Sequence, residues 1–323
     1  MYKLIRFYNQ NRKMIFKIIL IIVFIIGIIQ LLNWLTKLKS ERKIQNNVMQ
    51  NSSSVINNNS QEELLSNKSV ISGEKISDYK LENDTDVIKS FMTYCNDREL
   101  ESAYELLTDE CKEEMFSTVD DFKEIYYIPI FNGNSKVYTL ENWTDSTYKI
   151  EINDDVLATG KYEKENTVID YITVKENDDG EYKLNINKYI GKSDIDKETE
   201  QDSINIKAID SKIYTDYAIY TFEITNNSNR TILLDDLSNI DTVYLETKNG
   251  IKYSSYSHEL TQEQLKIGVS EKKKISIKYY SKYTLNKKID KAVFSKVILD
   301  YEKFKNLNNK SQFDNYSILE INV

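Results

Sequence analysis

The sequence predicts a mixed α+β protein in which a membrane helix precedes two folded domains. An uncharged apolar run occupies residues 18–35, residues 86–126 repeat their apolar positions at helix spacing, and from Lys136 onward the period changes to two. A length of 323 residues is sufficient for one anchor and two modest domains. We therefore expect a first domain of helices followed by antiparallel strands, and a second domain built of strands alone.

The run IILIIVFIIGIIQLLNWL at residues 18–35 carries no charge. Eighteen residues of helix span about 27 Å, close to the hydrocarbon thickness of a bilayer. A signal peptide is the alternative, but the following TKLKSERKIQ contains no A-x-A-like cleavage site. We predict a retained transmembrane helix over residues 14–36, which makes the protein a single-pass protein of the cell membrane.

Basic residues flank the apolar run on both sides, with a slight excess before it. This bias favours a cytoplasmic tail at residues 1–13, and long domains cross the membrane largely regardless of their charge. The bulk of the chain is therefore predicted to be extracytoplasmic. Residues 37–83 include the polar, aperiodic NNVMQNSSSVINNNS and are predicted to be a flexible linker.

The first domain is predicted over residues 84–192, and its helical half comes first. One helix, capped by Thr85 or Asp86, ends at Asn96-Asp97. A second helix follows, and Thr108-Asp109 starts a third helical turn that leads to Met115 and Phe116. A further short helix covers residues 117–125, and the helical half ends at Pro129. The predicted inward side chains are Val87, Ile88, Phe91, Met92, Cys95, Leu100, Ala103, Tyr104, Leu107, Val119, Phe122 and Ile125.

Strands complete the first domain and form the second. Residues 136–143, 146–152, 156–163, 167–176 and 181–190 alternate and are rich in Tyr, Ile, Val and Thr. The polar residues 191–202 are predicted to be a connector. Strand-like segments then recur through residues 203–323, and the last of them covers residues 296–304. Lys248-Asn249-Gly250 predicts a hairpin turn. This spacing indicates an immunoglobulin-like β-sandwich, although the region has neither Cys nor Trp.

Acidic residues are concentrated in the first domain. Residues 85–190 hold 24 Asp and Glu against 11 Lys and Arg, a net of −13, whereas the whole chain has a net charge of −8. Such a surface repels phosphate backbones, so we expect no direct nucleic-acid binding. Within residues 97–124 there are 11 acidic residues and 3 basic ones, which we interpret as a solvated or partner-facing helix surface.

Motifs for catalysis, cofactors and metals are missing from the sequence. The only histidine, His258, has no second histidine at zinc-protease spacing, GKS at residues 191–193 lacks the upstream glycine of a phosphate loop, and DDG at residues 178–180 lacks the other ligands of a calcium loop. We interpret His258 as a surface or loop residue. We predict no catalytic, cofactor-binding or metal-binding residues, and no cofactor.

Cys95 and Cys111 are the only cysteines. Two cysteines do not make a disulfide scaffold, and their spacing matches no zinc site. The first interpretation is that both are small buried hydrophobic side chains. The alternative is one disulfide between Cys95 and Cys111.

Residues 84–192 resemble the NTF2-like superfamily. The resemblance lies in the helix containing Val87 and Phe91, the Asn-Asp break, the run ESAYELLTDECKEEMFSTVDDF, and a sheet that ends in EYKLNINKYI. It implies a cone in which three helices pack into a curved antiparallel sheet. Ketosteroid-isomerase-like members use an acidic base with hydrogen-bond donors, so Asp155 or Asp170 with Tyr127, Tyr138 or Tyr171 are the residues available for those roles. No feature of the sequence selects among them.

A cytoplasmic tail, a membrane helix and an external NTF2-like domain together resemble VirB8/TcpC-type conjugation proteins. TcpC-like members carry two NTF2-like domains, whereas residues 203–323 here predict a β-sandwich. The resemblance implies a non-enzymatic scaffold or assembly protein in a conjugation or type IV secretion complex of a Gram-positive bacterium. Its expected partners are the membrane and other membrane or surface proteins, and self-association is left open. The alternatives are a small-ligand binder or ketosteroid-isomerase-like enzyme, and an adhesion or wall-associated protein.

Overall fold

The computed structural model describes residues 54–56, 66–71, 73, 75–144, 146–155, 167–284 and 287–323. The described chain is a mixed α+β structure whose sheets are mostly antiparallel, which confirms the coarse fold class. The predicted tail at residues 1–13 and membrane helix at residues 14–36 lie outside the described residues. Of the helices that are described, none combines the length and the apolar character needed to span a bilayer.

The longest helix is α2 (Asp78–Asp97), which begins earlier than predicted. Ser77 caps it by accepting a hydrogen bond from the Lys80 amide. Its first turns are polar, and Lys80 pairs there at 2.8 Å with the fully buried Asp84. Because apolar residues do not recur at helix spacing in these turns, the sequence did not predict them to be helical. Residues 78–83 are therefore helix and not linker. Also within the predicted linker, β1 (Ser54–Ile56) pairs with β2.

Four short helices and one π-helical turn follow Arg98, whose left-handed conformation ends α2. In chain order they are α3 (Leu100–Glu105), α4 (Asp109–Met115), α5 (Val119–Phe122), the π-helix η1 (Lys123–Tyr127) and α6 (Ile128–Phe131).

The expected end of the helical half before Pro129 was wrong. Pro129 lies within the first two positions of α6, where the missing amide costs little. The π-helical turn also shifts the helical register, so Tyr126 and Tyr127 are buried in place of Ile125. Ile125 was predicted to face inward and is instead 52% exposed.

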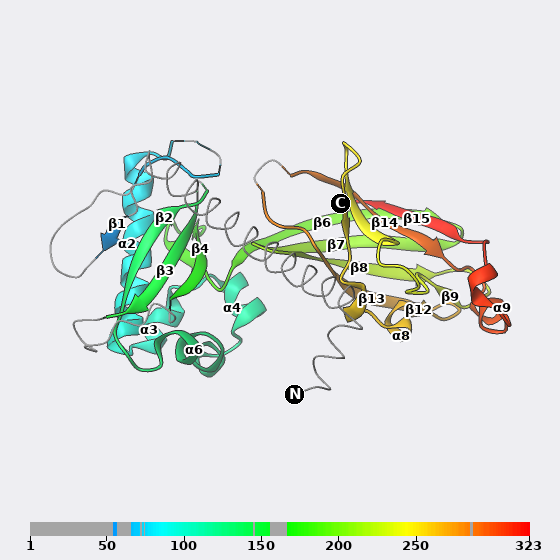
Figure 1. Cartoon of the computed structure of the whole chain (residues 1–323), viewed down its shortest axis with the longest axis horizontal. Coiled ribbons are helices and arrows are strands. Elements are labelled where there is room, and N and C mark those ends of the chain that lie inside the picture. The colour runs from blue at the N-terminus through cyan, green and yellow to red at the C-terminus, as the bar shows by residue number, and fades with distance from the viewer. Residues whose placement is uncertain are drawn as a thin grey trace, which may run out of the picture. The chain divides into compact units, whose positions relative to one another are not determined.

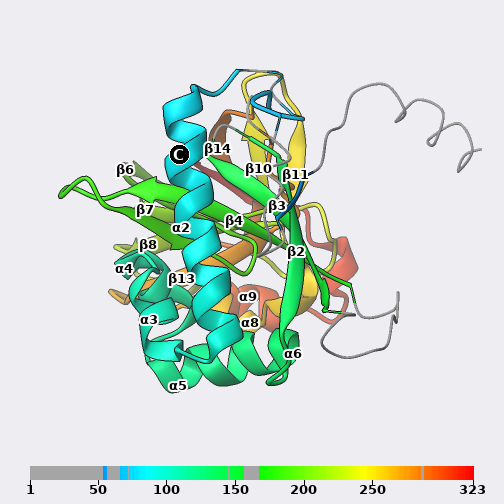
Figure 2. The same ribbon diagram turned by 90° about the vertical axis from the view of Figure 1, so that its left-hand side faces the viewer.

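The helices pack against a five-stranded antiparallel sheet in the order β1-β2-β3-β4-β5. Figure 2 shows α2 lying across this sheet. The first core, which includes Ile88, Phe91, Phe122, Ile150 and Leu184, fills the space between them. The strands that follow β1 are β2 (Lys136–Asn142), β3 (Thr147–Asp154), β4 (Val168–Glu176) and β5 (Tyr182–Asn185).

The predicted connector at residues 191–202 is a strand, which corrects the sequence prediction. β6 (Tyr189–Gln201) runs without interruption from the first core along β7 (Ile204–Tyr214) (Figure 1). Its outer half is charged and exposed because it lies at a sheet edge, where charges discourage pairing with other chains. A register shift between Asp194 and Lys197 further hides the period of two.

Two four-stranded antiparallel sheets, one of which includes β6, share a second apolar core. Their orders are β13-β8-β7-β6 and β11-β10-β14-β15, and β12-β9 forms a small third sheet. The second core includes Phe222, Leu245, Ile277 and Phe294. The strands are β8 (Ala218–Asn226), β9 (Ile232–Leu233), β10 (Val243–Thr247), β11 (Lys252–Ser254), β12 (Lys266–Ile267), β13 (Lys272–Tyr279), β14 (Ile289–Val297) and β15 (Ser317–Asn322).

The hairpin turn predicted at Lys248-Asn249-Gly250 is confirmed, because β10 pairs with β11 and Gly250 has a φ of 77°. Residues 296–304 were predicted to be a strand, but β14 ends at Val297 and a helix follows. β15 was not predicted. The short helices of this half are η3 (Ser257–Glu259), α8 (Gln262–Leu265), α9 (Tyr301–Lys305) and η4 (Lys310–Gln312).

Tyr279 carries a fully buried hydroxyl that finds no hydrogen-bond partner among the described residues. We expect Tyr279→Phe to raise the free energy of unfolding by between zero and about 1 kcal/mol, because an unpaired buried polar group is removed. The measurement is urea unfolding at pH 7. Tyr148→Phe is the control, since it removes the 2.9 Å bond to buried Asp84, and should cost about 2 kcal/mol.

The Tyr279→Phe substitution should also change how the free energy of unfolding depends on pH. Burial raises the pKa of Tyr279 well above its ordinary value of 10.0. The unfolded chain therefore loses this proton above pH 10 while the folded protein keeps it, so the stability present below pH 10 is lost as pH rises. Tyr279→Phe should lose less stability than the wild type between pH 9 and pH 11. An equal loss in both proteins would contradict this assignment.

Candidate functional site

Aromatic rings fill the space between the helices and the first sheet. Phe122 lies at the centre of this cluster, with ring centroids 6.1 Å from Phe91, 5.6 Å from Phe116, 5.8 Å from Tyr126 and 6.2 Å from Tyr104. These side chains are all buried. The chain therefore fills the space between these helices and the sheet with its own rings.

Asp170 of β4 is the buried carboxylate of this region, and donors surround it. Its Oδ2 accepts hydrogen bonds from the Tyr126 hydroxyl at 2.9 Å and from the Asn187 amide at 3.0 Å. Its Oδ1 accepts from the Lys188 amide at 2.8 Å and the Tyr171 amide at 2.7 Å. Burial raises the pKa of Asp170, and the four bonds oppose that rise.

The other candidates named by the sequence do not join Asp170. Asp155 follows the last residue of β3, Tyr127 stacks on Phe131 with ring centroids 5.3 Å apart, and the Tyr171 and Trp143 ring centroids lie 4.5 Å apart. Tyr138 is buried in the first core. The side-chain partner of Asp170 is Tyr126, which sequence reasoning missed because 44 residues separate the two. This arrangement uses Asp170 to hold the β5–β6 turn against the helices.

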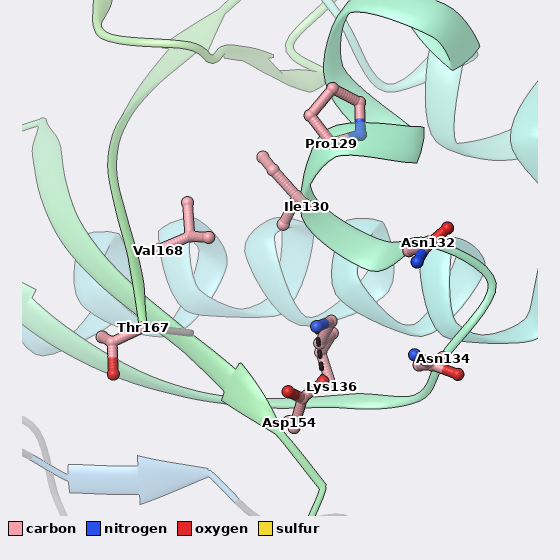
Figure 3. Close-up of a pocket in the computed structure, with 8 residues that line it drawn as sticks. All are labelled: Pro129, Ile130, Asn132, Asn134, Lys136, Asp154, Thr167 and Val168. Carbon is pink, nitrogen blue, oxygen red and sulfur yellow. Dashed lines mark hydrogen bonds and ion pairs between the residues drawn. The ribbon is translucent and has the colours of Figure 1, made fainter. Parts of the chain in front are cut away.

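A pocket of about 280 Å³ opens where α6 meets the ends of β2, β3 and β4. Figure 3 shows Ile130 and Val168 on opposite sides of it, with Lys136 directed at Asp154. The Lys136 Nζ lies 2.6 Å from the Asp154 Oδ1. The lining residues are Pro129, Ile130, Asn132, Asn134, Lys136, Asp154, Thr167 and Val168.

Asn96 positions Lys136 in this pocket from the end of α2. Its side chain accepts from the Lys136 amide at 2.8 Å and donates to the Lys136 carbonyl at 2.9 Å. The Lys136 side chain is only 8% exposed, so its charge depends on Asp154. The pocket therefore contains an ion pair without net charge.

Two carboxylates of α4 bind the β6–β7 strands. Glu110 accepts from the Tyr189 hydroxyl at 2.6 Å and the Lys192 amide, and pairs with the Lys175 Nζ at 3.0 Å. Gly191 permits this approach: it has a φ of 156°, and a Cβ there would lie 2.5 Å from the Lys175 Nζ. Such charge-assisted bonds are stronger than neutral ones.

Glu114 lies one helical turn after Glu110 and binds the neighbouring strand. It accepts from the Tyr214 hydroxyl at 2.7 Å and pairs with Lys212. Burial raises the pKa of the Tyr189 and Tyr214 hydroxyls, and each bonded glutamate adds to the rise, so both phenols stay protonated as donors. Glu110 and Glu114 with these partners are called the carboxylate clamp.

The carboxylate clamp changes the interpretation of the acidic stretch. Glu99, Glu101, Glu105, Asp109 and Glu113 are exposed, as the helix pattern predicted. Glu110 and Glu114 are only partly exposed, because they bind residues 65 to 100 positions away. No local signal separates these two glutamates from their neighbours, so sequence reasoning missed them.

Cys95 and Cys111 are free, fully buried thiols in the first core. This arrangement agrees with their interpretation as small buried side chains, and the alternative disulfide is not formed in the structure. Burial raises the pKa of Cys111 to about 12 and that of Cys95 further. Protonated thiols are poor nucleophiles, so neither residue has the character of a reactive cysteine.

We expect the folded chain to react with fewer than one equivalent of Ellman's reagent at pH 8 within minutes. In urea, both thiols should react. Burial keeps the reagent away from both sulfur atoms, and it disfavours the thiolate, which is the form that reacts. A reduced and an unreduced sample should give the same two thiols in urea; two thiols that appear only after reduction would show that the disulfide forms.

His258 lies on the surface with its side chain 67% exposed, which agrees with its predicted place. Within the described part of the chain, no three His, Cys, Asp or Glu side chains gather as a metal site would require. Comparison with family models, with curated proteins and with solved structures finds no match to this chain.

Proposed function

We propose that this chain is a non-enzymatic, single-pass membrane scaffold whose extracytoplasmic part holds two modules as one body. The observation that carries the proposal is the junction: β6 passes from the first core to the second sheet, and the carboxylate clamp ties α4 to both β6 and β7. A flexible tether would let modules act separately. A paired strand with partly buried polar bonds transmits position and force between them.

Finer features support the same proposal. The helices over the five-stranded sheet fit an NTF2-like module, and the two four-stranded sheets around one core fit an immunoglobulin-like module. The apolar run at residues 18–35 supplies the anchor. Together they resemble an assembly component of a conjugation or type IV secretion complex of a Gram-positive bacterium.

The test is purification of the full chain from its own membranes after amine crosslinking. We expect reproducible higher-mass species that contain other membrane proteins, and these species should weaken when Glu110 and Glu114 are both changed to glutamine. Recovery of the monomer alone, across crosslinkers of different length, would count against a scaffold.

A small-ligand binder is the second candidate, and the pocket beside α6 favours it. The filled interior and the four donors around Asp170 do not favour ketosteroid-isomerase-like chemistry, which needs a base within reach of a substrate. An adhesive role for residues 203–323 is testable only by point substitutions. Truncation before residue 203 would leave β6 without its strand partner β7.

A further inference from the structure

The two edges of the sheet β13-β8-β7-β6 carry opposite charges (Figure 1). The edge strand β13 begins with three lysines at residues 272–274. The other edge strand is β6, whose residues 194–201 include four acidic residues and one lysine. Like charges oppose the pairing of either edge with the same edge of a second copy, but opposite charges favour pairing between the two different edges.

The β13 edge offers free backbone groups for such pairing. The Tyr256 amide donates to the Lys278 carbonyl at 2.8 Å from the side away from β8. Residues two apart in a strand turn their backbone groups to the same side, so Lys272 and Lys274 also turn theirs away from β8. Among the described residues, none bonds to the backbone of these two lysines on that side.

The β6 edge offers backbone groups in the same way. A two-residue turn closes the β6–β7 hairpin between Gln201 and Ile204, so Glu198 and Glu200 turn their backbone groups away from β7. Both glutamates are exposed, and no described residue bonds to their backbone on that side. The strand β15 of the other four-stranded sheet comes near β6 but does not pair with it.

One row of side chains crosses the whole sheet with alternating charge. Glu198 of β6 lies opposite Lys207 of β7. Lys207 lies opposite Glu223 of β8, which in turn lies opposite Lys274 of β13. Glu223 pairs with Lys272 at 2.6 Å, and the exposed Lys274 makes no ion pair with a described residue. A further strand that places a carboxylate opposite Lys274 would continue the alternation, and such cross-strand pairs are stabilising.

We propose that a second copy of this chain supplies that strand, by pairing its β6 with β13 so that its Glu198 lies opposite Lys274 and its Glu200 opposite Lys272. Strand directions already alternate across the sheet, so the added β6 continues the antiparallel order. The contact joins two different edges and is therefore head-to-tail, which leaves each pair of copies with one free edge of each kind. The inference rests on the scaffold function and deepens it, because it makes a second copy one of the partners.

The test is disulfide trapping between two differently tagged full-length chains in the same membrane, one with Lys274→Cys and the other with Glu198→Cys. Hydrogen-bonded opposite residues of an antiparallel ladder have Cα atoms about 5.5 Å apart, which a disulfide can bridge. The control pair Lys272→Cys with Glu198→Cys is two residues out of register, beyond the reach of about 7 Å. We expect the first pair to give at least ten times more mixed dimer than the control pair. The native thiols are buried, so chains without engineered cysteines give the background.

A charge swap at the neighbouring pair tests whether the opposite charges matter. Lys272→Glu on the Lys274→Cys chain should lower the yield of mixed dimer at least fivefold, and so should Glu200→Lys on the Glu198→Cys chain. The two changes together should restore the yield. Absence of the mixed dimer, an equal yield from the out-of-register pair, a dimer formed by the Lys274→Cys chain alone, or no rescue by the swap would overturn the proposal.

The outcome separates from that of the scaffold proposal. Mixed disulfide dimers, together with amine-crosslinked species that contain no other membrane protein, would keep the sheet pairing and sink the scaffold. Amine-crosslinked species that contain other membrane proteins, without mixed disulfide dimers, would leave the scaffold and sink the sheet pairing.

Discussion

Replacing Asp170 with alanine is expected to lower the free energy of unfolding by about 4 kcal/mol. The substitution leaves four donors, three of them backbone amides, without their acceptor in a buried site. Each unsatisfied buried group costs about 1–3 kcal/mol, and water entering the cavity recovers part of that cost. Urea unfolding followed by circular dichroism measures the change.

Asp170→Asn is the matched variant. The amide keeps the volume and one acceptor oxygen but turns an NH₂ group toward two of the donors, so we expect a loss of about 2–3 kcal/mol. Tyr126→Phe removes only one donor and should cost about 1–2 kcal/mol. If Asp170→Ala unfolded at the same urea concentration as the wild type, Asp170 would not hold the β5–β6 turn. A catalytic role for its carboxylate would then have to be tested.

Local signals predicted much of the fold. The apolar stripe of α2, the Asn96-Asp97 break, the strands predicted at residues 136–143, 146–152 and 167–176 and the Lys248-Asn249-Gly250 turn depend on neighbouring residues, and the structure has each of them. The strand predicted at residues 156–163 lies outside the described residues. The mixed α+β class followed from these elements.

Errors arose where tertiary contacts decide the local structure. β6 was predicted to be a connector because its residues 192–201 are polar, yet pairing with β7 makes it a strand. Pro129 was predicted to end the helices, although its position at the start of α6 makes its missing amide harmless. For β6, the deciding partner β7 lies beyond the window in which a sequence period is measured.

The candidate site was less predictable than the fold. Asp170 was named among the candidates for an acidic residue, but its partner Tyr126 was not, because nothing in the helix period separates Tyr126 from Tyr127. The pocket depends on three separate segments around Ile130, Asp154 and Val168. Long-range hydrogen bonds and pockets produce no periodic pattern in the sequence.

Changing both Glu110 and Glu114 to glutamine is expected to uncouple the two halves. Each glutamate accepts a bond from a tyrosine and pairs with a lysine, and these partners lie on the strands of the β6–β7 ribbon or on β4. Charge-assisted bonds contribute about 1.5–3 kcal/mol each, and partial exposure of both carboxylates places them at the lower end. We expect the double substitution to lower the free energy of unfolding by about 3 kcal/mol.

Hydrogen exchange followed by mass spectrometry distinguishes uncoupling from general destabilisation. Amides of residues 189–193 and 212–214 should exchange at least tenfold faster in the double variant, whereas those of β8 and β13 should keep their wild-type rates. Glu113→Gln is the control, because this glutamate lies between the two on α4 and is exposed. If the double variant matched Glu113→Gln, the clamp would contribute no rigidity, and the junction would depend on strand pairing alone.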